Sequence, residues 1–150
     1  MRLLHIKLWL GSIVTGTIFG LMALIVENTT NVKVYTLLMN VDYIPILKEF
    51  SFPVWVEFSY HLMVCLVITY ALYLIARHFR WTKRKVLGVS IGVNVIIALL
   101  LFPTTALSER TPSWKSIEAL SWWVALHAFY GLLVGLFLIL MLGAKKYATS

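Results

Sequence analysis

Residues 117–144 read IEALSWWVALHAFYGLLVGLFLILMLGA, and no charged side chain follows Glu118 in this stretch. An α-helix needs roughly 20 predominantly apolar residues to cross a hydrocarbon core about 30 Å thick. Three further runs approach or exceed that length, at about residues 8–26, 55–76 and 86–107. The sequence therefore predicts an all-α, polytopic membrane protein with a bundle of four transmembrane helices.

The composition of the whole chain agrees with this interpretation. The chain is 61% hydrophobic and 13% charged, and its mean hydropathy is +0.88. Soluble globular domains carry about 25% charged residues. Because four spans use most of the 150 residues, we expect a single transmembrane domain over residues 1–150 and no separate soluble domain.

The charged residues divide between the two sides of this arrangement. All six carboxylates lie on one side: Glu27, Asp42, Glu49, Glu57, Glu109 and Glu118. Four basic residues accompany them: Lys33, Lys48, Arg110 and Lys115. The remaining basic residues lie on the opposite side: Arg2, Lys7, Arg77, Arg80, Lys83, Arg84, Lys85, Lys145 and Lys146. Since Lys and Arg concentrate in cytoplasmic loops, we expect both termini in the cytoplasm and the loops around residues 27–54 and 104–116 outside.

The net charge of +7 has its densest source in the short basic loop at residues 77–85. A cluster of Lys and Arg next to a membrane span is attracted to anionic lipid headgroups. We therefore expect the lipid bilayer as partner of this loop, and no nucleic acid. The same short loop predicts that the second and third spans are antiparallel neighbours.

The first outer loop contains a helical pattern of its own. Val34, Leu37, Leu38 and Val41 recur at i, i+3, i+4 and i+7. This spacing predicts a short interfacial helix at the outer headgroups. A re-entrant segment is the alternative, and it requires protein partners for its backbone groups.

Two local signals mark the ends of later spans. Pro103 is expected to kink or end the third span near its outer end. Ser116 precedes the fourth span at the position of an N-cap residue, and Glu118 then lies in the first turn, where a negative charge is favourable.

Three spans carry a Gly-x-x-x-Gly pair, a spacing that places both glycines on one helix face. The pairs are Gly16 with Gly20, Gly88 with Gly92 and Gly131 with Gly135. Small residues let helix backbones approach closely inside lipid. We expect these pairs to support tight packing within the bundle, and a leftover small-residue face leaves a homodimer open.

The second span carries a polar stripe instead. Glu57, His61, Cys65 and Thr69 follow one another at intervals of four residues. Such groups are costly against lipid, so we expect the stripe to face protein or a wet cavity. Together with Asn94 of the third span and His127 of the fourth, Glu57 and His61 are the candidates for a polar pocket that opens outward.

Several interpretations of these polar residues stay open. They can be ordinary interhelical hydrogen bonds. They can form a proton-responsive or proton-conducting site, because His titrates near pH 6.5. They can bind a lipid, a quinone or a partner helix. A metal or haem site is the least favoured, since no His-x-x-x-His, Glu-x-x-His or cysteine cluster is present; we expect no metal and no cofactor.

Other residues are interpreted as ordinary features of a membrane protein. An aromatic belt is predicted from Trp55, Trp114, Trp122 and Trp123 outside and from Trp9 and Trp81 inside. Glu109 and Arg110 are taken as solvated loop residues. No nucleophile elbow or P-loop motif occurs, and so no catalytic residue is assigned.

One family shares a pattern with most of the chain. The pattern comprises a glycine-rich first span, an early His61, Pro103 in the third span, the loop Thr111-Pro112-Ser113-Trp114 and the run from Trp122 to Gly131. In this order it resembles the YagU-like small inner-membrane proteins of bacteria. The resemblance implies a multi-pass protein of the bacterial inner membrane, dimeric and linked to acid tolerance, and it supplies no catalytic residue.

The sequence thus favours a non-enzymatic membrane protein that adapts to envelope conditions or acid stress through protonation of Glu57, His61 and His127. A small channel or carrier for an ion, a proton or an amphiphile is the first alternative. A structural subunit that packs with a membrane protein partner is the second.

Overall fold

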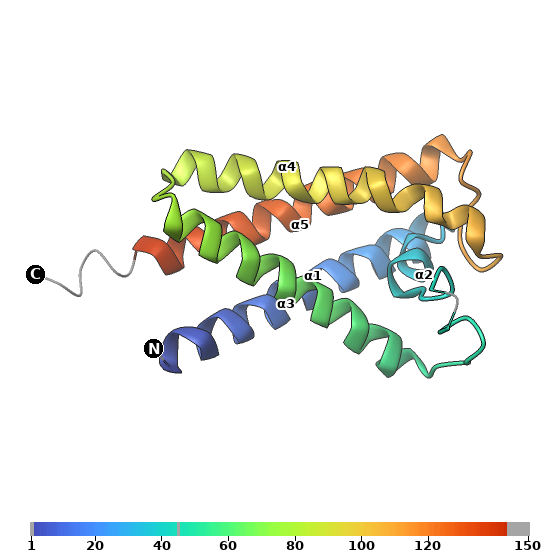
Figure 1. The fold of residues 1–150 in the computed structure, drawn as a ribbon. Coiled ribbons are helices and arrows are strands. Elements are labelled where there is room, and N and C mark those ends of the chain that lie inside the picture. The colour runs from blue at the N-terminus through green and yellow to red at the C-terminus, as the bar shows by residue number, and fades with distance from the viewer. Residues whose placement is uncertain (1, 45, 144–150) are drawn as a thin grey trace, which may run out of the picture.

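The computed structural model describes residues 2–44 and 46–143 (Figure 1). In this part of the chain, helices are the only regular elements, and turns and loops connect them. Its elements are α1 (Arg2–Thr30), α2 (Val34–Met39), α3 (Val54–His78), α4 (Lys83–Leu101), the 3₁₀-helix η1 (Phe102–Leu107) and α5 (Ile117–Gly143). Four of these segments are long and apolar enough to cross a membrane: α1, α3, α4 with η1, and α5. The predicted all-α class and the four long helices are therefore confirmed.

The predicted spans fall inside longer helices. The first span, at residues 8–26, is extended at both ends to give α1, and the span at 55–76 becomes α3. The span at 86–107 corresponds to α4 and η1 together. The fourth span was predicted to end at Ala144; α5 ends at Gly143, and Ala144 lies outside the described residues.

Local sequence signals explain where these helices end. Asn31 follows α1 with a φ of 61°, and Arg80 follows α3 with a φ of 51°. At Arg80 the backbone N–H of Trp81 donates to the carbonyl of Ala76, which is the hydrogen bond of a Schellman motif. Pro103 lies at the start of η1, where the α-helix has ended as predicted.

The fourth long helix begins at a side-chain cap. The Ser116 hydroxyl accepts a hydrogen bond from the backbone N–H of Ala119 at 3.2 Å, which confirms the predicted N-cap. The short helix α2 is capped from another element, because the Glu27 carboxylate accepts bonds from the N–H and the hydroxyl of Thr36. This contact fixes α2 against the end of α1.

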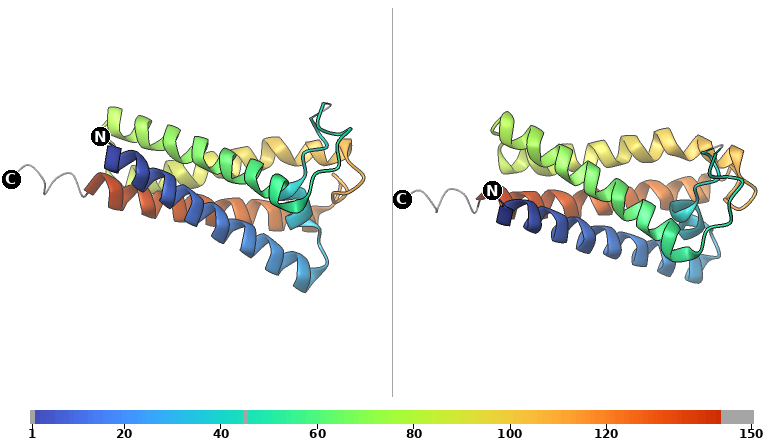
Figure 2. Two further views of the ribbon diagram at one scale, coloured as in Figure 1. Left: turned by 90° about the horizontal axis from the view of Figure 1, so that it is seen from below. Right: turned by 60° about the horizontal axis from the view of Figure 1, so that its bottom comes forward.

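The long helices run antiparallel in chain order, so the two ends of the bundle differ (Figures 1 and 2). One end carries the start of α1, the turn from α3 to α4 and the end of α5; we call it the basic end, after Arg2, Lys7 and the cluster at residues 77–85. The other carries α2, the 40–53 loop and the loop from η1 to α5; we call it the acidic end, after its six carboxylates.

The helices pack in unequal pairs. The closest pairing is α4 with α5, followed by α1 with α3 and α1 with α5. Although a short turn joins them, α3 and α4 diverge toward the acidic end and make almost no helix–helix contact (Figure 1). They are antiparallel, but the prediction that they are packed neighbours is wrong, because α1 and α5 take up their inner faces.

The glycine pairs show why the pairing is unequal. A Cβ atom on Gly131 would lie 2.6 Å from the Ser90 carbonyl oxygen, so the backbones of α4 and α5 touch there. Gly16 and Gly20 pack against side chains of α3. Gly88 and Gly92 have no neighbouring atom within 4 Å of such a Cβ in the described chain. The expectation of tight packing within the bundle is therefore wrong for this third pair, which lies on the outer face of α4.

Large apolar side chains are exposed along all four long helices, and the mostly apolar interior also holds several polar side chains. The buried polar residues include Ser12, Thr69, Ser90 and Asn94. Examples of the exposed residues are Leu10, Val14, Leu21, Val67, Leu74, Leu99, Leu100, Leu136 and Leu140. Apolar surface of this extent is unusual for a monomeric soluble protein and is typical of a membrane or protein contact.

Candidate functional site

The polar stripe of α3 faces the interior of the bundle. Glu57, His61, Cys65 and Thr69 are all buried, as predicted from their spacing. Cys65 lies eight positions after Glu57, so this part of the stripe descends roughly 12 Å from the acidic end at 1.5 Å per residue. It meets polar residues of α4 and α5 at its deep end.

The four pocket candidates predicted from the sequence line one cavity. Glu57, His61, Asn94 and His127 all contribute to a cavity of about 170 Å³ between α3, α4 and α5. Most of the remaining lining is apolar. It comes from α3, α4 and α5, from Phe19 of α1, from residues between Leu37 and Ile44, and from Leu47.

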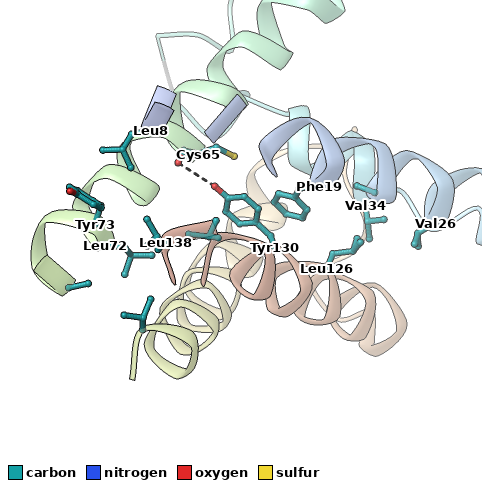
Figure 3. Packing of buried hydrophobic residues seen from close by; sticks show 14 residues of the cluster. Leu8, Phe19, Val26, Val34, Cys65, Leu72, Tyr73, Leu126, Tyr130 and Leu138 are labelled. Carbon is teal, nitrogen blue, oxygen red and sulfur yellow. Dashed lines mark hydrogen bonds between the residues drawn. The ribbon is translucent and has the colours of Figure 1, made fainter. Parts of the chain in front are cut away.

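The ring of Phe19 organises the deep end of this cavity. Its centroid lies 4.8 Å from that of Tyr130, with the two rings stacked, and 5.0 Å from that of His127 in an edge-on arrangement. The His61 ring lies 5.4 Å away on another side. Figure 3 shows the Phe19 and Tyr130 rings side by side in the core. The two histidines therefore share one aromatic neighbour.

Each histidine is fixed by a backbone carbonyl. His61 donates from Nε2 to the carbonyl of Gly16 at 3.0 Å, and His127 donates from Nδ1 to the carbonyl of Trp123 at 2.9 Å. Because a carbonyl oxygen only accepts, these contacts determine which nitrogen carries the hydrogen. In the neutral rings, Nδ1 of His61 and Nε2 of His127 are then acceptors.

The other polar groups at the deep end also direct their donors to protein. The Tyr130 hydroxyl donates to the Cys65 carbonyl at 3.3 Å, drawn as a dashed line in Figure 3. The Trp123 indole donates to the Ala98 carbonyl at 3.1 Å, and the Asn94 amide donates to the Ser90 carbonyl at 2.8 Å. Oδ1 of Asn94 is buried and has no partner in the described chain.

An ionic contact at the acidic end involves Glu57, which also lines the cavity. Arg110 Nη1 lies 2.9 Å from Glu57 Oε1 and 3.5 Å from Asp42 Oδ1. Ser108 also donates to Asp42, at 3.0 Å. The contact joins α3, the 40–53 loop and the loop from η1 to α5; we call it the Arg110 clasp, after Arg110, Glu57 and Asp42.

The interpretation of Arg110 as a solvated loop residue is therefore wrong. Its side chain is 50% exposed, but its guanidinium neutralises Glu57, whose side chain is only 4% exposed. The hydrogen bond that Arg110 donates to Glu57, with the charges of Glu57 and Asp42, raises the pKa of Arg110 against the opposing effect of burial. A buried carboxylate requires such a partner, and sequence spacing gave no sign of a pair 53 residues apart.

Helix α2 and the segment that follows it pack beside the cavity at the acidic end. Val34, Leu37 and Met39 of α2 are buried, and so is Val41. Exposed side chains occur in two parts of the cavity lining: Met63 and Val64 on α3, and Ile44 at the acidic end. The expectation of a pocket that opens outward stays a prediction.

Sequence reasoning missed one aromatic contributor to the site. Trp123, assigned to an aromatic belt, is buried and lines the cavity next to His127, at 4.3 Å between ring centroids. The signal that indicates it is spacing, since positions 123, 127 and 130 are i, i+4 and i+7 on one helix face. Helical spacing also placed Tyr130 and Ser121 near His127: Tyr130 does line the cavity, whereas Ser121 is exposed.

The described residues 2–44 and 46–143 contain no group of three or more His, Cys, Asp or Glu side chains that could hold a metal ion. The single cysteine, Cys65, is buried with its sulfur 3.9 Å from Nδ1 of His61. Comparisons of the chain with protein-family models, curated proteins and solved structures find no match. The functional assignment therefore depends on the geometry of the cavity alone.

Proposed function

We propose that this chain is a multi-pass protein of a bacterial inner or plasma membrane that binds a single-headed amphiphile in the cavity between α3 and α4. One observation carries the proposal: the cavity lining is mostly apolar and includes the buried polar side chains of His61, Asn94 and His127. A cavity of this shape matches a molecule with an apolar tail and a small polar head.

The membrane itself is supported by the exposed surface. Large apolar side chains are exposed along all four long helices, and polar side chains are buried between them. Because the basic end carries an excess of Lys and Arg, it lies in the cytoplasm, with both termini on that side. In this orientation α2 lies near the outer headgroups, packed on the bundle.

Cysteine labelling on intact cells tests the orientation. Ser51→Cys lies at the exposed acidic end and Phe79→Cys at the exposed basic end, while the native Cys65 is buried. A membrane-impermeant thiol reagent is expected to label the Ser51 variant in intact cells and the Phe79 variant only after permeabilisation. The reverse pattern would invert the topology.

The amphiphile is proposed to enter sideways from the bilayer. We take the exposed lining residues Met63 and Val64, on the helix that diverges from α4, as the entrance, while the Arg110 clasp holds Glu57 at the acidic end. A route through the bundle side suits a ligand that is already dissolved in lipid. The polar deep end lies near the middle of the bundle, so the head rather than the tail determines binding there.

Photocrosslinking in lipid nanodiscs tests the binding site. A twelve-carbon amphiphile with a diazirine in its chain is expected to label residues around the cavity, with Val64→Trp removing this label by filling the opening. Val67→Trp is the matched control, since Val67 is exposed on the same helix and does not line the cavity. Equal labelling of both variants, or labelling spread evenly over the outer surface, would refute the proposal.

A proton-responsive role in envelope or acid-stress adaptation is the second candidate function. The specific observation in its favour is that two buried histidines contact the same Phe19 ring. Liposomes containing a pH dye test for proton flux, which must be lost in His127→Ala. Trp123 fluorescence serves as the conformational signal. If neither flux nor fluorescence changes between about pH 5 and 7.5, where histidine ordinarily titrates, the candidate fails.

A further inference from the structure

At the deep end of the cavity, the donors named below have hydrogen-bond partners, whereas two acceptors have none among the described residues. The donors of His61, His127, Trp123 and Tyr130 each bond a backbone carbonyl, at distances between 2.9 and 3.3 Å. Asn94 likewise uses an N–H toward the Ser90 carbonyl. Each of these bonded donors is therefore directed into the protein.

The acceptors are left free. Oδ1 of Asn94 is buried without a partner in the described chain, and Asn94 lines the cavity. In the tautomer fixed by Trp123, Nε2 of the neutral His127 ring is an acceptor, and no donor of the described residues bonds it. A buried acceptor that loses water without gaining a donor destabilises the protein. The cavity thus offers acceptors to a ligand that can donate a hydrogen bond.

The charge of the region limits which donor is suitable. Glu57 is the carboxylate nearest this cavity in the described lining, and Arg110 holds it at 2.9 and 3.4 Å. No free negative charge is then available beside Asn94 and His127 within the residues described. Transfer of an ammonium group from water to an apolar environment without a counter-charge is far more costly than transfer of a hydroxyl.

We infer that the head group bound at Asn94 and His127 is an uncharged hydroxyl, so that the ligand is a lipophilic alcohol that donates a hydrogen bond to Asn94 Oδ1 or to His127 Nε2. The inference rests on the proposed amphiphile site and specifies its ligand class. Carbonyl-headed molecules such as quinones and esters carry acceptors only, and would meet the free acceptors of Asn94 and His127 without supplying a donor.

The test uses the full chain in phosphatidylcholine nanodiscs and three probes with one diazirine chain: a twelve-carbon alcohol, its methyl ether and the corresponding primary amine. At equal mole fraction in the membrane, the alcohol is expected to label cavity peptides about five-fold more than the ether, the ratio that corresponds to ~1 kcal/mol for one net hydrogen bond. Asn94→Leu should reduce this preference. Tyr73→Phe, which removes a buried unpartnered hydroxyl outside the cavity, should keep it.

The possible outcomes separate the two proposals. Equal labelling of the cavity by alcohol and ether would overturn the hydroxyl inference and leave the amphiphile site intact. Stronger labelling by the amine would overturn it as well, in favour of a cationic head. If none of the probes labels the cavity above the outer surface, the proposed function itself fails. The wild-type comparison decides the matter even if Asn94→Leu does not fold.

Discussion

The two faces of α4 are packed in opposite ways. On one face, Val86, Ser90, Asn94 and Ala98 form a buried ridge with a spacing of four residues, and the Gly131 backbone lies directly against its middle. On the side toward α3, helix contact is almost absent, and a cavity replaces it. Inside a membrane, helices associate where small residues allow close approach. Gly131 thus allows α5 to pack closely against α4. Helices α3 and α4 have no such contact, and the cavity is lined by both of them.

The largest expected effect tests the rigid pair. Gly131→Leu should destabilise the fold by about 3 kcal/mol or more, because the new side chain would begin 2.6 Å from the Ser90 oxygen and 2.7 Å from the Ile91 Cα. Backbone atoms cannot move aside as a side chain can. Thermal unfolding in detergent, followed by tryptophan fluorescence, measures the loss.

Gly88→Leu is the matched control for this change. It has the same glycine-to-leucine chemistry on α4, but no atom of the described chain lies within 4 Å of a Cβ there. We expect its melting temperature to stay close to that of the wild type. A comparable loss in the monomeric protein would mean that the outer face of α4 is packed after all, and the contrast between the two faces would be lost.

The next largest effect concerns the Arg110 clasp, which holds the loose side of the bundle together. Arg110→Met leaves Glu57 buried without a counter-charge and should cost about 2 kcal/mol, less than for a fully buried pair because half of the Arg110 side chain is exposed. Lys115→Met, a change of the same charge at an exposed site, should have no comparable effect. Adding Glu57→Gln should recover part of the loss; a strictly additive double variant would show that the two residues are not coupled.

The Arg110 contribution should also be constant across ordinary pH. Its pKa is raised in the folded state, chiefly by the hydrogen bond with Glu57. A group with a raised pKa contributes stability that is fully present below its unfolded pKa and is lost as the pH rises through the folded value. For arginine, the folded and unfolded pKa values both lie far above ordinary pH. The difference in free energy of unfolding between wild type and Arg110→Met should therefore not be reduced by deprotonation of Arg110 between pH 6 and 9.

A smaller effect is expected where α1 meets α3. His61→Leu removes the hydrogen bond to the Gly16 carbonyl, and should cost about 1 kcal/mol, in the range found for polar contacts between membrane helices. Val67→Leu changes an exposed residue on the same helix and should be neutral. Indistinguishable unfolding of the two variants in detergent would show that His61 contributes nothing to helix packing.

The sequence was sufficient for features that depend on composition and local spacing. The four long helices follow from apolar length, the Ser116 cap from residue type, and the buried stripe of α3 from its period of four. Which face of a helix meets which neighbour was not predictable in this way. The Gly88 pair has the same motif as the Gly131 pair, yet only the latter faces another helix, because the choice depends on the packing of the whole bundle.

Long-range contacts explain the remaining errors about the site. The bond between Arg110 and Glu57 joins residues 53 positions apart, and α3 and α4 make almost no contact although a short turn joins them. Neither feature can be recognised from the periodicity of the sequence. Trp123 is different: its position on the face of His127 and Tyr130 was visible in the sequence, but the frequent role of tryptophan at membrane interfaces led to the wrong assignment.

The smallest expected change in stability is at Asn94, and it distinguishes a binding residue from a structural one. Asn94→Leu removes a bond to the Ser90 carbonyl but also an acceptor that is buried without a partner, so we expect the free energy of unfolding to change by less than ~0.5 kcal/mol. Thr111→Val is the comparison, because that buried hydroxyl donates to the carbonyls of Thr105 and Ser108 and its loss should cost about 1 kcal/mol. Asn94 would then contribute to ligand binding and not to the stability of the fold, as expected for a polar group at a functional site. If Asn94→Leu proves as destabilising as Thr111→Val, Asn94 belongs to the rigid α4–α5 pair and its free oxygen has a protein partner.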